Sequence, residues 1–253
     1  MSTLDLTPAA VAAPRSRRIL RHSLMEAKLI VRNGEQLLLA LVIPVGLLVA
    51  YAAAGERFGI PHEAFGASVL ALGLWSTGFT TLAVTTGFER RYGVLERLAA
   101  TPLRRVDLLL GKALSVTLIA LGQAAVIVVV ALALGWSPRP TLAQTLIAGV
   151  AVVLALPAFA ALGLALAGVA SAELTLALSN LIYLAGAALG VVVPVAAFPA
   201  WAQPVLGLLP TSALAGTLGT WAGGGTDPLP LAVLIVWVVV GLALARKVFR
   251  WTS

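Results

Sequence analysis

Long apolar segments alternate with short polar connections along this chain, and the pattern predicts membrane-spanning helices. A helix needs about 20 apolar residues to cross roughly 30 Å of hydrocarbon. Six segments approach or exceed this length: residues 37–54, 65–88, 108–134, 142–169, 174–198 and 229–245. Their interiors carry no charged residue, and Lys112, near one end of its segment, is expected to extend its ammonium group to the membrane surface. Because lipid leaves a lone strand unpaired, the predicted fold is an all-α integral membrane protein with six transmembrane helices.

The composition agrees with this class and excludes several functions. Of the 253 residues, 60% are hydrophobic and 11% are charged, whereas soluble domains are usually about 45–50% apolar and about 25% charged. This balance leaves no room for a separate soluble catalytic domain. Cysteine is absent, which excludes thiolate metal sites, and the two histidines, His22 and His62, have no metal-ligand partner at a useful spacing. We therefore expect neither a metal nor a cofactor on this chain.

The basic residues indicate how the chain lies in the membrane. A net charge of +7 would suggest nucleic acid in a soluble protein, but basic residues in a membrane protein set its topology, so no nucleic-acid partner is expected. With both termini inside, fifteen of the 17 basic residues are cytoplasmic, and only Arg57 and Arg139 lie outside. The excess of arginine over lysine and the abundance of alanine fit a bacterium with a GC-rich genome. We predict a multi-pass protein of the bacterial inner membrane with cytoplasmic termini.

An amphipathic helix is predicted before the first span. At helical spacing, residues 17–32 carry apolar side chains on one face: Leu20, Leu24, Ala27 and Val31. A second face carries charges: Arg21, Lys28, Arg32 and, just beyond this range, Glu35. Such a helix lies flat in the headgroup layer, where basic charge favours anionic membrane lipids. Residues 15–34 are therefore assigned to an interfacial helix with a break near Asn33-Gly34, residues 1–14 to a disordered leader, and residues 15–253 to one transmembrane domain.

Two alternatives exist for this N-terminal region. It could be a solvated leader with an accidental apolar stripe. It could also be a cleaved signal peptide, but the first apolar run of 18 residues is longer than the usual ~7–15 and contains Pro44. We favour the interfacial helix.

The long connection before the last span, residues 199–228, is rich in proline, glycine and tryptophan but remains apolar. A solvated loop would be more polar, so we predict an external re-entrant or interfacial hairpin broken at Pro204 and Pro210. A seventh span is the alternative. It would place the C-terminus outside and contradict the distribution of basic residues.

Residues 89–105, here called the charged link, separate the second and third apolar segments. They contain five arginines and two glutamates and can lie only in water. A short helix is predicted within them, with Val94, Leu95 and Leu98 on one side. Glu96 and Arg97 point away from that side. Its content is that of an amphipathic helix presented to a partner outside the bilayer.

The ends of this short helix are also predicted. Gly93 permits a turn just before it, and Thr101-Pro102 offers an N-cap and a first helical residue for the next helix. A rigid, charge-rimmed helix between two long spans suits the transmission of force. The alternative is a loop whose arginines only anchor the flanking helices, and these residues alone do not decide between the two.

The sequence E-R-R-Y-G-V-L-E-R-L-A-A-T-P-L, followed by L-L-L-G-K-A, resembles the region between the second and third spans of type-2 ABC exporter permeases. This class includes the daunorubicin-resistance, polysaccharide-export and ABCG-like permeases. The residues that match its pattern are Glu89, Gly93, Leu95, Glu96, Thr101, Pro102, Gly111 and Lys112. The stretch F-P-A-W-A-Q-P-V-L-G-L-L-P-T-S-A-L also resembles the segment before the last span of that family. The resemblance covers nearly the whole chain.

The resemblance implies the permease subunit of an ATP-driven exporter. Two permeases, identical or related, would work with two nucleotide-binding ATPase subunits that hold ATP and Mg. A cytoplasmic coupling helix would sit in a groove of the ATPase subunit, with contacts from Glu89, Arg90, Arg91, Tyr92, Val94, Leu95, Glu96, Arg97, Leu98, Thr101 and Pro102. Glu173, in the next inner connection, would make a smaller contact.

The residues independently place ATP hydrolysis on another chain. A P-loop needs the pattern G-x-x-x-x-G-K-[ST] to hold phosphates. The only Gly-Lys pair, Gly111-Lys112, is followed by Ala113, and Val106 stands where the first glycine should be. We therefore expect this chain not to be an enzyme by itself.

The second predicted span is unusually rich in hydroxyl groups: Ser76, Thr77, Thr80, Thr81, Thr85 and Thr86. Hydroxyls can bond back to their own helix, so an ordinary bent span is one explanation. In the resembled family the second and fifth spans face the partner permease and line the translocation path. This implies path roles for Thr77, Phe79, Thr80, Asn180 and Tyr183, with internal packing as the alternative for each.

A weakly polar, uncharged path suits a hydrophobic or amphipathic cargo, such as a drug, an antibiotic or a lipid-like molecule, because an ion would need compensating charge. Gln123 in the third span is expected to make an interhelical hydrogen bond instead.

Two other functions stay open from the residues alone. An ion-coupled secondary transporter usually needs intramembrane acids or unwound helices, and buried carboxylates are not expected in these spans. A membrane-embedded lipid-processing enzyme would need clustered acids or histidines, whereas the 10 acidic residues are scattered. Export out of the cytoplasm is the favoured interpretation, and its direction comes from the resemblance.

Overall fold

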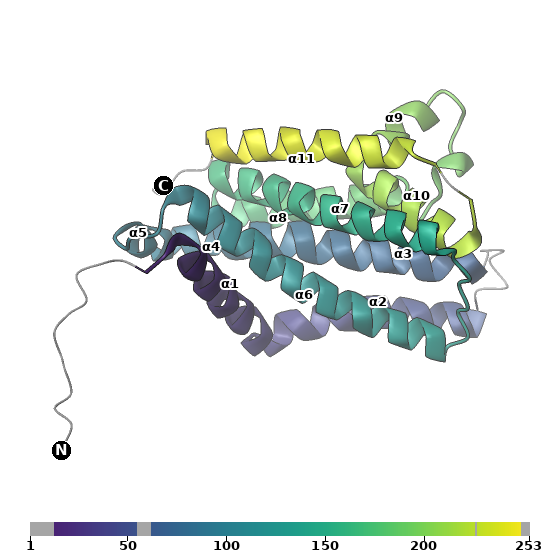
Figure 1. The fold of residues 1–253 in the computed structure, drawn as a ribbon, viewed down its shortest axis with the longest axis horizontal. Helices are drawn as coiled ribbons and strands as arrows, with labels where there is room; N and C mark the ends of the chain where they lie inside the picture. The colour runs from purple at the N-terminus through teal and green to yellow at the C-terminus, as the bar shows by residue number, and fades with distance from the viewer. Residues whose placement is uncertain (1–12, 55–61, 226, 249–253) are drawn as a thin grey trace, which may run out of the picture.

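The computed structural model describes residues 13–54, 62–225 and 227–248, and the regular elements in these ranges are helices. Long helices run side by side, and the N-terminal helix crosses them at one end (Figure 1). In chain order they are α1 (Arg15–Arg32), α2 (Gly34–Ala54), α3 (His62–Trp75), η2 (Ser76–Thr81), α4 (Leu82–Arg91), α5 (Val94–Ala99), α6 (Arg105–Ala133), α7 (Leu142–Val169), α8 (Ala172–Ala188), η3 (Val195–Ala197), α9 (Gln203–Gly207), α10 (Pro210–Gly223) and α11 (Leu229–Val248).

Four helical segments among the described residues are long and apolar enough to cross a membrane: Phe65–Arg91, Arg105–Ala133, Leu142–Val169 and Leu229–Val248. They correspond to the second, third, fourth and sixth predicted spans. The first and fifth predicted spans contain shorter apolar stretches, Ala40–Ala53 and Ala172–Ala188. The all-helical class is therefore confirmed, and the count of six spans stays a prediction.

The fifth predicted span, residues 174–198, is helical only as far as Ala188. Beyond it, Gly190 has a φ of +118°, which L side chains rarely adopt, and Pro194 follows. The Ser212 hydroxyl donates a 2.8 Å hydrogen bond to the carbonyl of Leu189 and satisfies a group that the helix end leaves unpaired. Glycine and proline thus end the helix before the apolar run ends.

The apolar connection before the last span folds into α9 and α10, which begin at its prolines. Pro204 and Pro210 lie in the first turns of these helices, where a fixed φ and a missing N–H are tolerated. The 14 residues of α10 are too few to cross the bilayer. Its Leu214 and Leu218 are buried, and the helix packs on α3, α7 and α11. The predicted breaks are confirmed, and a re-entrant position in the membrane stays a prediction.

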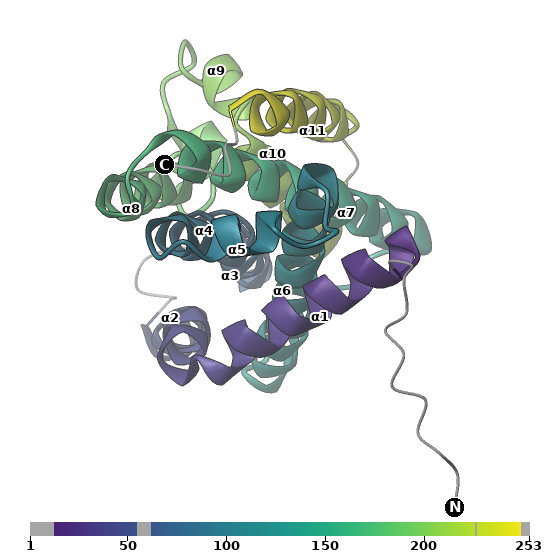
Figure 2. The ribbon, with the colours of Figure 1, turned by 90° about the vertical axis from the view of Figure 1, so that its left-hand side faces the viewer.

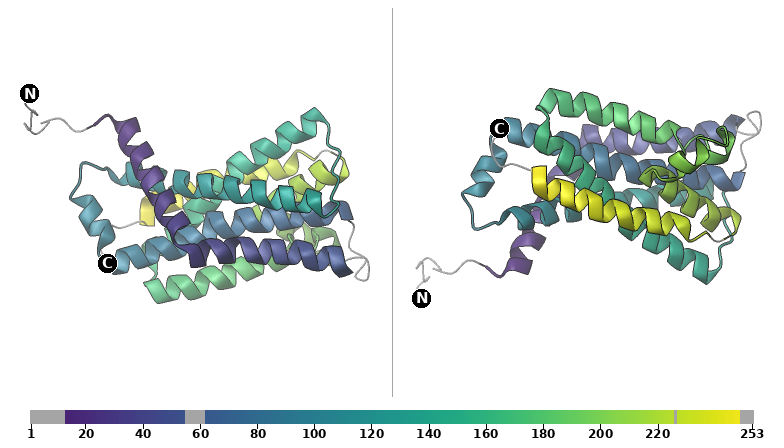
Figure 3. Two further views of the ribbon diagram at one scale, coloured as in Figure 1. Left: turned by 90° about the horizontal axis from the view of Figure 1, so that it is seen from below. Right: turned by 90° about the horizontal axis from the view of Figure 1, so that it is seen from above.

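The segment formed by α3, η2 and α4 is the most buried of the four long ones, with 78% of its apolar window inside the bundle. Figure 3 shows it between the other helices from both sides. An aromatic cluster fixes its middle. The rings of Trp75 and Phe79 stack with centroids 4.4 Å apart, and Phe159 of α7 meets Trp75 edge-on at 4.7 Å.

The six residues Ser76–Thr81 form a π-helix inside this segment. The π-helix lies directly against α7 at Gly163. A Cβ atom at residue 163 would lie 2.7 Å from the carbonyl oxygen of Phe79 and 3.3 Å from the amide nitrogen of Ala83. The two helices therefore touch backbone to backbone, and only glycine fits at this contact.

At one end of the bundle, here called the charged end, α1, the α4–α5 connection, the start of α6 and the last turn of α11 come together (Figure 2). Arg246 and Lys247 lie in that last turn of α11. The start of α1 lies at the same end, so both ends of the described chain are on one side of the bundle (Figure 1). This agrees with the prediction that both termini share a side.

α1 buries several polar residues against the bundle and leaves its leucines exposed. His22, Ser23, Glu26 and Ile30 are buried, and the helix packs mainly on α6. The apolar side chains of the predicted stripe are exposed: Leu20 by 51%, Leu24 by 52% and Val31 by 49%. An interfacial helix needs such a free apolar face, although its place in the headgroup layer stays a prediction. The predicted break is confirmed, because α1 ends at Arg32 and α2 begins at Gly34.

We expect Gly163→Ala to destabilise the protein, because the new methyl group would collide with the backbone of Phe79. Overpacking of this kind costs about 1–3 kcal/mol, which thermal unfolding in detergent would show as a lower Tm. Gly149→Ala is the matched control, since nothing lies within 4 Å of a Cβ at that position of the same helix. Alanine favours helices, so this variant should melt at the same or a higher temperature. Equal melting of the two variants would contradict the tight contact.

Candidate functional site

The charged link is a short helix that is anchored on one face and exposed on the other. Gly93 has a φ of +68° and turns the chain sharply between α4 and α5, as predicted. Leu95 is completely buried, while Val94 and Leu98 are partly buried. Glu96 and Arg97 are exposed, so the predicted amphipathic pattern is confirmed. Tyr92, just before the turn, is 63% exposed.

Thr101 and Pro102 differ from the prediction. They do not begin the next helix, because α6 starts at Arg105 with Arg104 as its N-cap residue. The Thr101 hydroxyl instead donates a 2.6 Å hydrogen bond back to the carbonyl of Leu98 and so caps the C-terminal end of α5. Pro102 disfavours a helical conformation for the residue before it, which explains the short extended stretch between the helices. Both residues are exposed.

Two arginines tie the charged link to the connection between α7 and α8. Arg91 forms an ion pair with Glu173, which lies in the first turn of α8. Arg90 donates a hydrogen bond to the carbonyl of Ala170. The structure therefore brings together the two connections that the sequence singled out separately. Exposed ion pairs contribute little free energy, so the contact defines geometry more than stability.

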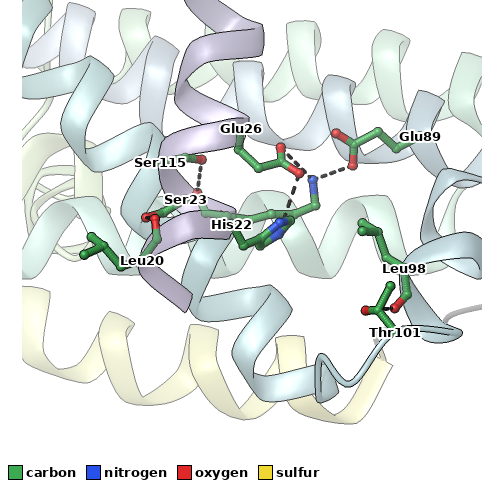
Figure 4. A network of polar contacts seen from close by, with 9 residues as sticks. Leu20, His22, Ser23, Glu26, Glu89, Leu98, Thr101 and Ser115 are labelled. Carbon is green, nitrogen blue, oxygen red and sulfur yellow. Dashed lines mark hydrogen bonds and ion pairs between the residues drawn. The ribbon is translucent and has the colours of Figure 1, made fainter. Parts of the chain in front are cut away.

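Glu89 is partly buried and pairs with Lys112 (Figure 4). Lys112 is 0% exposed and also lies 3.1 Å from a carboxylate oxygen of Glu26. The expectation that Lys112 reaches the membrane surface is wrong, because two carboxylates meet it inside the protein. These three residues, here called the ionic cluster, join α4, α6 and α1. A buried charge is tolerated only when it is paired in this way.

A second set of charges joins α1 to the start of α6. Asp107 is completely buried, and Arg15 donates a 2.6 Å hydrogen bond to it. Arg18 lies 3.8 Å from the same carboxylate and donates a 2.5 Å hydrogen bond to the carbonyl of Pro102. From the sequence alone, these arginines were expected only to set the topology. Four acidic residues at the charged end each meet a basic partner: Glu26, Glu89, Asp107 and Glu173. Acidic residues are rare in so apolar a chain, and this rarity was the signal in the sequence that could have indicated paired charges.

His22 packs beside the ionic cluster. Its Nε2 atom lies 3.6 Å from a carboxylate oxygen of Glu26. Gly111 makes room for the ring, since a Cβ at residue 111 would lie 2.4 Å from the imidazole. Burial lowers the pKa of His22 below its ordinary value, and Lys112 adds to the effect while Glu26 opposes it. Within the described residues, no group of three or more His, Asp or Glu side chains could hold a metal ion.

Three of the five predicted path residues line one hollow. Thr80, Asn180 and Tyr183 border a cavity of about 280 Å³ between α2, the π-helix and α8. Its described walls carry hydroxyl and amide groups next to apolar side chains, and among these residues the Tyr183 phenol is the only ionisable group. The Thr80 hydroxyl is buried without a hydrogen-bond partner. The hollow can therefore offer hydrogen bonds to an uncharged molecule.

The other two predicted path residues lie in the core. Thr77 is 1% exposed and donates a 2.5 Å hydrogen bond to Gln123, and Phe79 is 2% exposed and stacks on Trp75. The amide of Gln123 also donates to the carbonyl of Ala40 at 2.6 Å, so its predicted interhelical bonding is confirmed. The structure thus separates these two residues from the hollow.

Buried carboxylates, which were not expected, do exist in this chain. Glu26 and Asp107 are buried at the charged end, and both are paired with basic side chains. None of them lines the hollow. The argument against ion coupling therefore depends on where the acids lie rather than on their absence.

Residues 59–247, about three quarters of the chain, match the ABC-2 family of transporter proteins. The chain belongs to this family of ABC transporter permeases. It is a multi-pass membrane transport subunit and not itself an ATPase, and its family implies a separate ATPase partner. No curated protein was found to match it.

We expect Lys112→Met to destabilise the protein strongly, because it leaves two carboxylates buried without their partner. Removal of one member of a buried ion pair typically costs about 3–5 kcal/mol. Chemical unfolding in detergent should show this loss, whereas Arg91→Met, which breaks the exposed pair with Glu173, should cost at most about 1 kcal/mol. The triple variant Glu26→Gln, Glu89→Gln, Lys112→Met should recover much of the stability. Similar losses for the two single variants would contradict the role of burial.

We expect the protein to lose stability as the pH falls from about 7 to about 5, because the unfolded chain protonates His22 near pH 6.5 and the folded protein resists that proton. A base whose pKa is lower in the folded protein than in the unfolded chain stabilises the folded state at pH values above the unfolded pKa. This stabilisation is lost as the pH decreases. Tm measured across this range should fall less steeply for His22→Gln. An unchanged slope in that variant would show that other groups cause the dependence.

Proposed function

We propose that this chain is the transmembrane subunit of an ATP-driven exporter that moves an uncharged hydrophobic or amphipathic cargo, such as a drug, an antibiotic or a lipid-like molecule, out of the cytoplasm. The observation that carries the proposal is the form of the charged link. It is an exposed helix held rigidly between two long membrane helices. Such an element suits the transmission of movement from a motor subunit.

The ATPase subunit would bind the free face of α5. Tyr92, Glu96 and Arg97 are exposed there, and Thr101 and Pro102 extend the same surface. Leu95 and its partly buried neighbours Val94 and Leu98 would transmit force to the bundle. The remaining residues of the predicted set would act indirectly. Glu89 positions α4 through Lys112, while Arg90, Arg91 and Glu173 hold the neighbouring connection in place.

The charged end would face the cytoplasm of a bacterial cell. Fourteen of the fifteen basic residues that the topology rule assigns inside lie in the described part of the chain, and all fourteen belong to segments at or beside this end. ATP and Mg would be bound by the partner subunit only. We place no cofactor on this chain.

A second permease copy, identical or related, would pack beside α8. This helix exposes Leu176, Asn180, Leu181 and Leu184. A polar amide is costly in contact with lipid, so Asn180 favours a protein or cargo neighbour over hydrocarbon. The cavity beside Asn180 would then be enclosed between the two copies. Its uncharged hydroxyl and amide groups suit a cargo that carries hydroxyl, ether or carbonyl groups on an apolar body.

We expect the double charge reversal Glu96→Lys, Arg97→Glu to reduce transport at least tenfold in proteoliposomes that contain the permease and its ATPase. Both side chains are exposed, so the protein should still fold and insert. The ATPase rate should lose its dependence on cargo. Arg139→Glu is the control, because Arg139 is exposed and lies outside the charged link.

Equal transport by the double variant and the wild type would contradict the role of α5. Transport that continues without ATP and collapses with an ionophore would favour a secondary transporter. Turnover of a lipid by the purified chain alone would favour an enzyme.

A further inference from the structure

A groove with a volume of about 260 Å³ lies between the second half of α1 and the α4–α5 turn, outside the hollow assigned to cargo. The two carboxylates of the ionic cluster, Glu26 and Glu89, both line it. Its main walls are formed by Glu26, Leu29 and Ile30 of α1 and by Phe88, Glu89 and Tyr92. A molecule bound here would contact α1 and the charged link together.

Carboxylates are the only charged groups among the described residues that line the groove: Glu26 and Glu89. Lys112 lies behind them and contacts both. Arg90 donates its hydrogen bond to the carbonyl of Ala170. A cation in the groove would therefore meet carboxylate oxygens and no basic side chain of the described lining.

The other walls suit the rest of an amphiphile. The rings of Phe88 and Tyr92 stack with centroids 6.1 Å apart. An ammonium group within about 6 Å of such a ring face is attracted to it. Leu29 is 57% exposed at the rim, and Met25, one turn earlier on the same side of α1, is 48% exposed. The groove thus combines a carboxylate floor, an aromatic wall and an apolar exit.

We propose that this groove binds the ammonium head group of an amphiphile, with the cation beside Glu89 and over Tyr92 and the alkyl tail along Leu29 and Met25 of α1. The ligand would hold α1 against the charged link. Two sources share this chemistry: an amine-bearing membrane lipid such as phosphatidylethanolamine, and a free alkylammonium compound. This inference goes beyond the proposed function and does not require the ATPase subunit.

The test uses the full chain in nanodiscs of phosphatidylglycerol, with decyltrimethylammonium as the probe below its micelle concentration. Decyl maltoside, which has the same tail and an uncharged head, is the comparator. Binding isotherms should show at least tenfold tighter binding of the ammonium probe. Glu89→Gln should weaken its binding about tenfold, and Tyr92→Ala should weaken it at least threefold. Tyr92→Phe should bind like the wild type, because it keeps the ring.

Asp227→Asn is the matched control, since it removes an exposed carboxylate remote from the groove in the sequence and should leave binding unchanged. Equal affinity for the two probes, or unchanged binding in both Glu89→Gln and Tyr92→Ala, would overturn the proposal. If Glu89→Gln proves unstable, the comparison between Tyr92→Ala and Tyr92→Phe still decides the matter, because Tyr92 is exposed and both variants should fold.

The source of the ligand is decided by native mass spectrometry of the protein released from mixed nanodiscs. Retention of phosphatidylethanolamine by the wild type and its loss in Glu89→Gln would identify a lipid. Binding of decyltrimethylammonium without retention of this lipid would identify a free cationic amphiphile. Preferential retention of phosphatidylglycerol at the groove would contradict the site.

Discussion

The arrangement of the charged end depends on one buried ammonium group. Lys112 is completely buried, and an unpaired charge at such a position would cost several kcal/mol. Glu26 and Glu89 remove most of that cost only when α1 and α4 both reach α6. Charge pairing therefore requires the amphipathic helix and the base of the charged link to meet on the same surface. Gly111 contributes sterically, because its missing side chain leaves the space that His22 fills.

In the proposed exporter, this constraint would make α1 move together with α6 and the charged link. The ionic cluster fixes α1 at Glu26, and Asp107 fixes it again through Arg15. Arg18 extends the connection to the carbonyl of Pro102, just beyond α5. A force applied to α5 in the proposed exporter would therefore reach α1 and α6 together. The exposed leucines of α1 would couple the same unit to the membrane surface.

The sequence predicted the elements whose causes are local. The apolar runs located the long helices, Gly93 located the turn before α5, and the prolines located the starts of α9 and α10. The pairing of Lys112 could not be predicted, because its partners are 86 and 23 residues away and a lysine near a span end ordinarily extends to water. The early end of α8 was missed because the prediction followed the apolar run past Gly190 and Pro194, which end the helix. The role of Thr101 was missed because it depends on a specific hydrogen bond.

For the predicted path residues, the sequence indicated the helices that border the hollow but not which side of each helix faces it. Six hydroxyls marked the second span, and a regular α-helix would have placed Thr77 and Thr80 on nearly the same side. The π-helix changes this relation, so Thr80 borders the hollow while Thr77 is buried against Gln123. A six-residue π-helix has no distinct hydrophobic period, so the sequence carries no sign of it.

The position of this π-helix links the two candidate sites physically. α4 has 10 residues and is therefore about 15 Å long. It joins the charged link to Ser76–Thr81 without an intervening loop. An α-helix of this length is stiff along its axis, so in the proposed exporter a displacement of α5 would reach the π-helix. The π-helix is the weakest part of the segment, since its hydrogen-bond pattern is the rarest, and Gly163 holds it at one point. Movement at the charged end would therefore be converted into a change of shape at the wall of the hollow, beside Thr80.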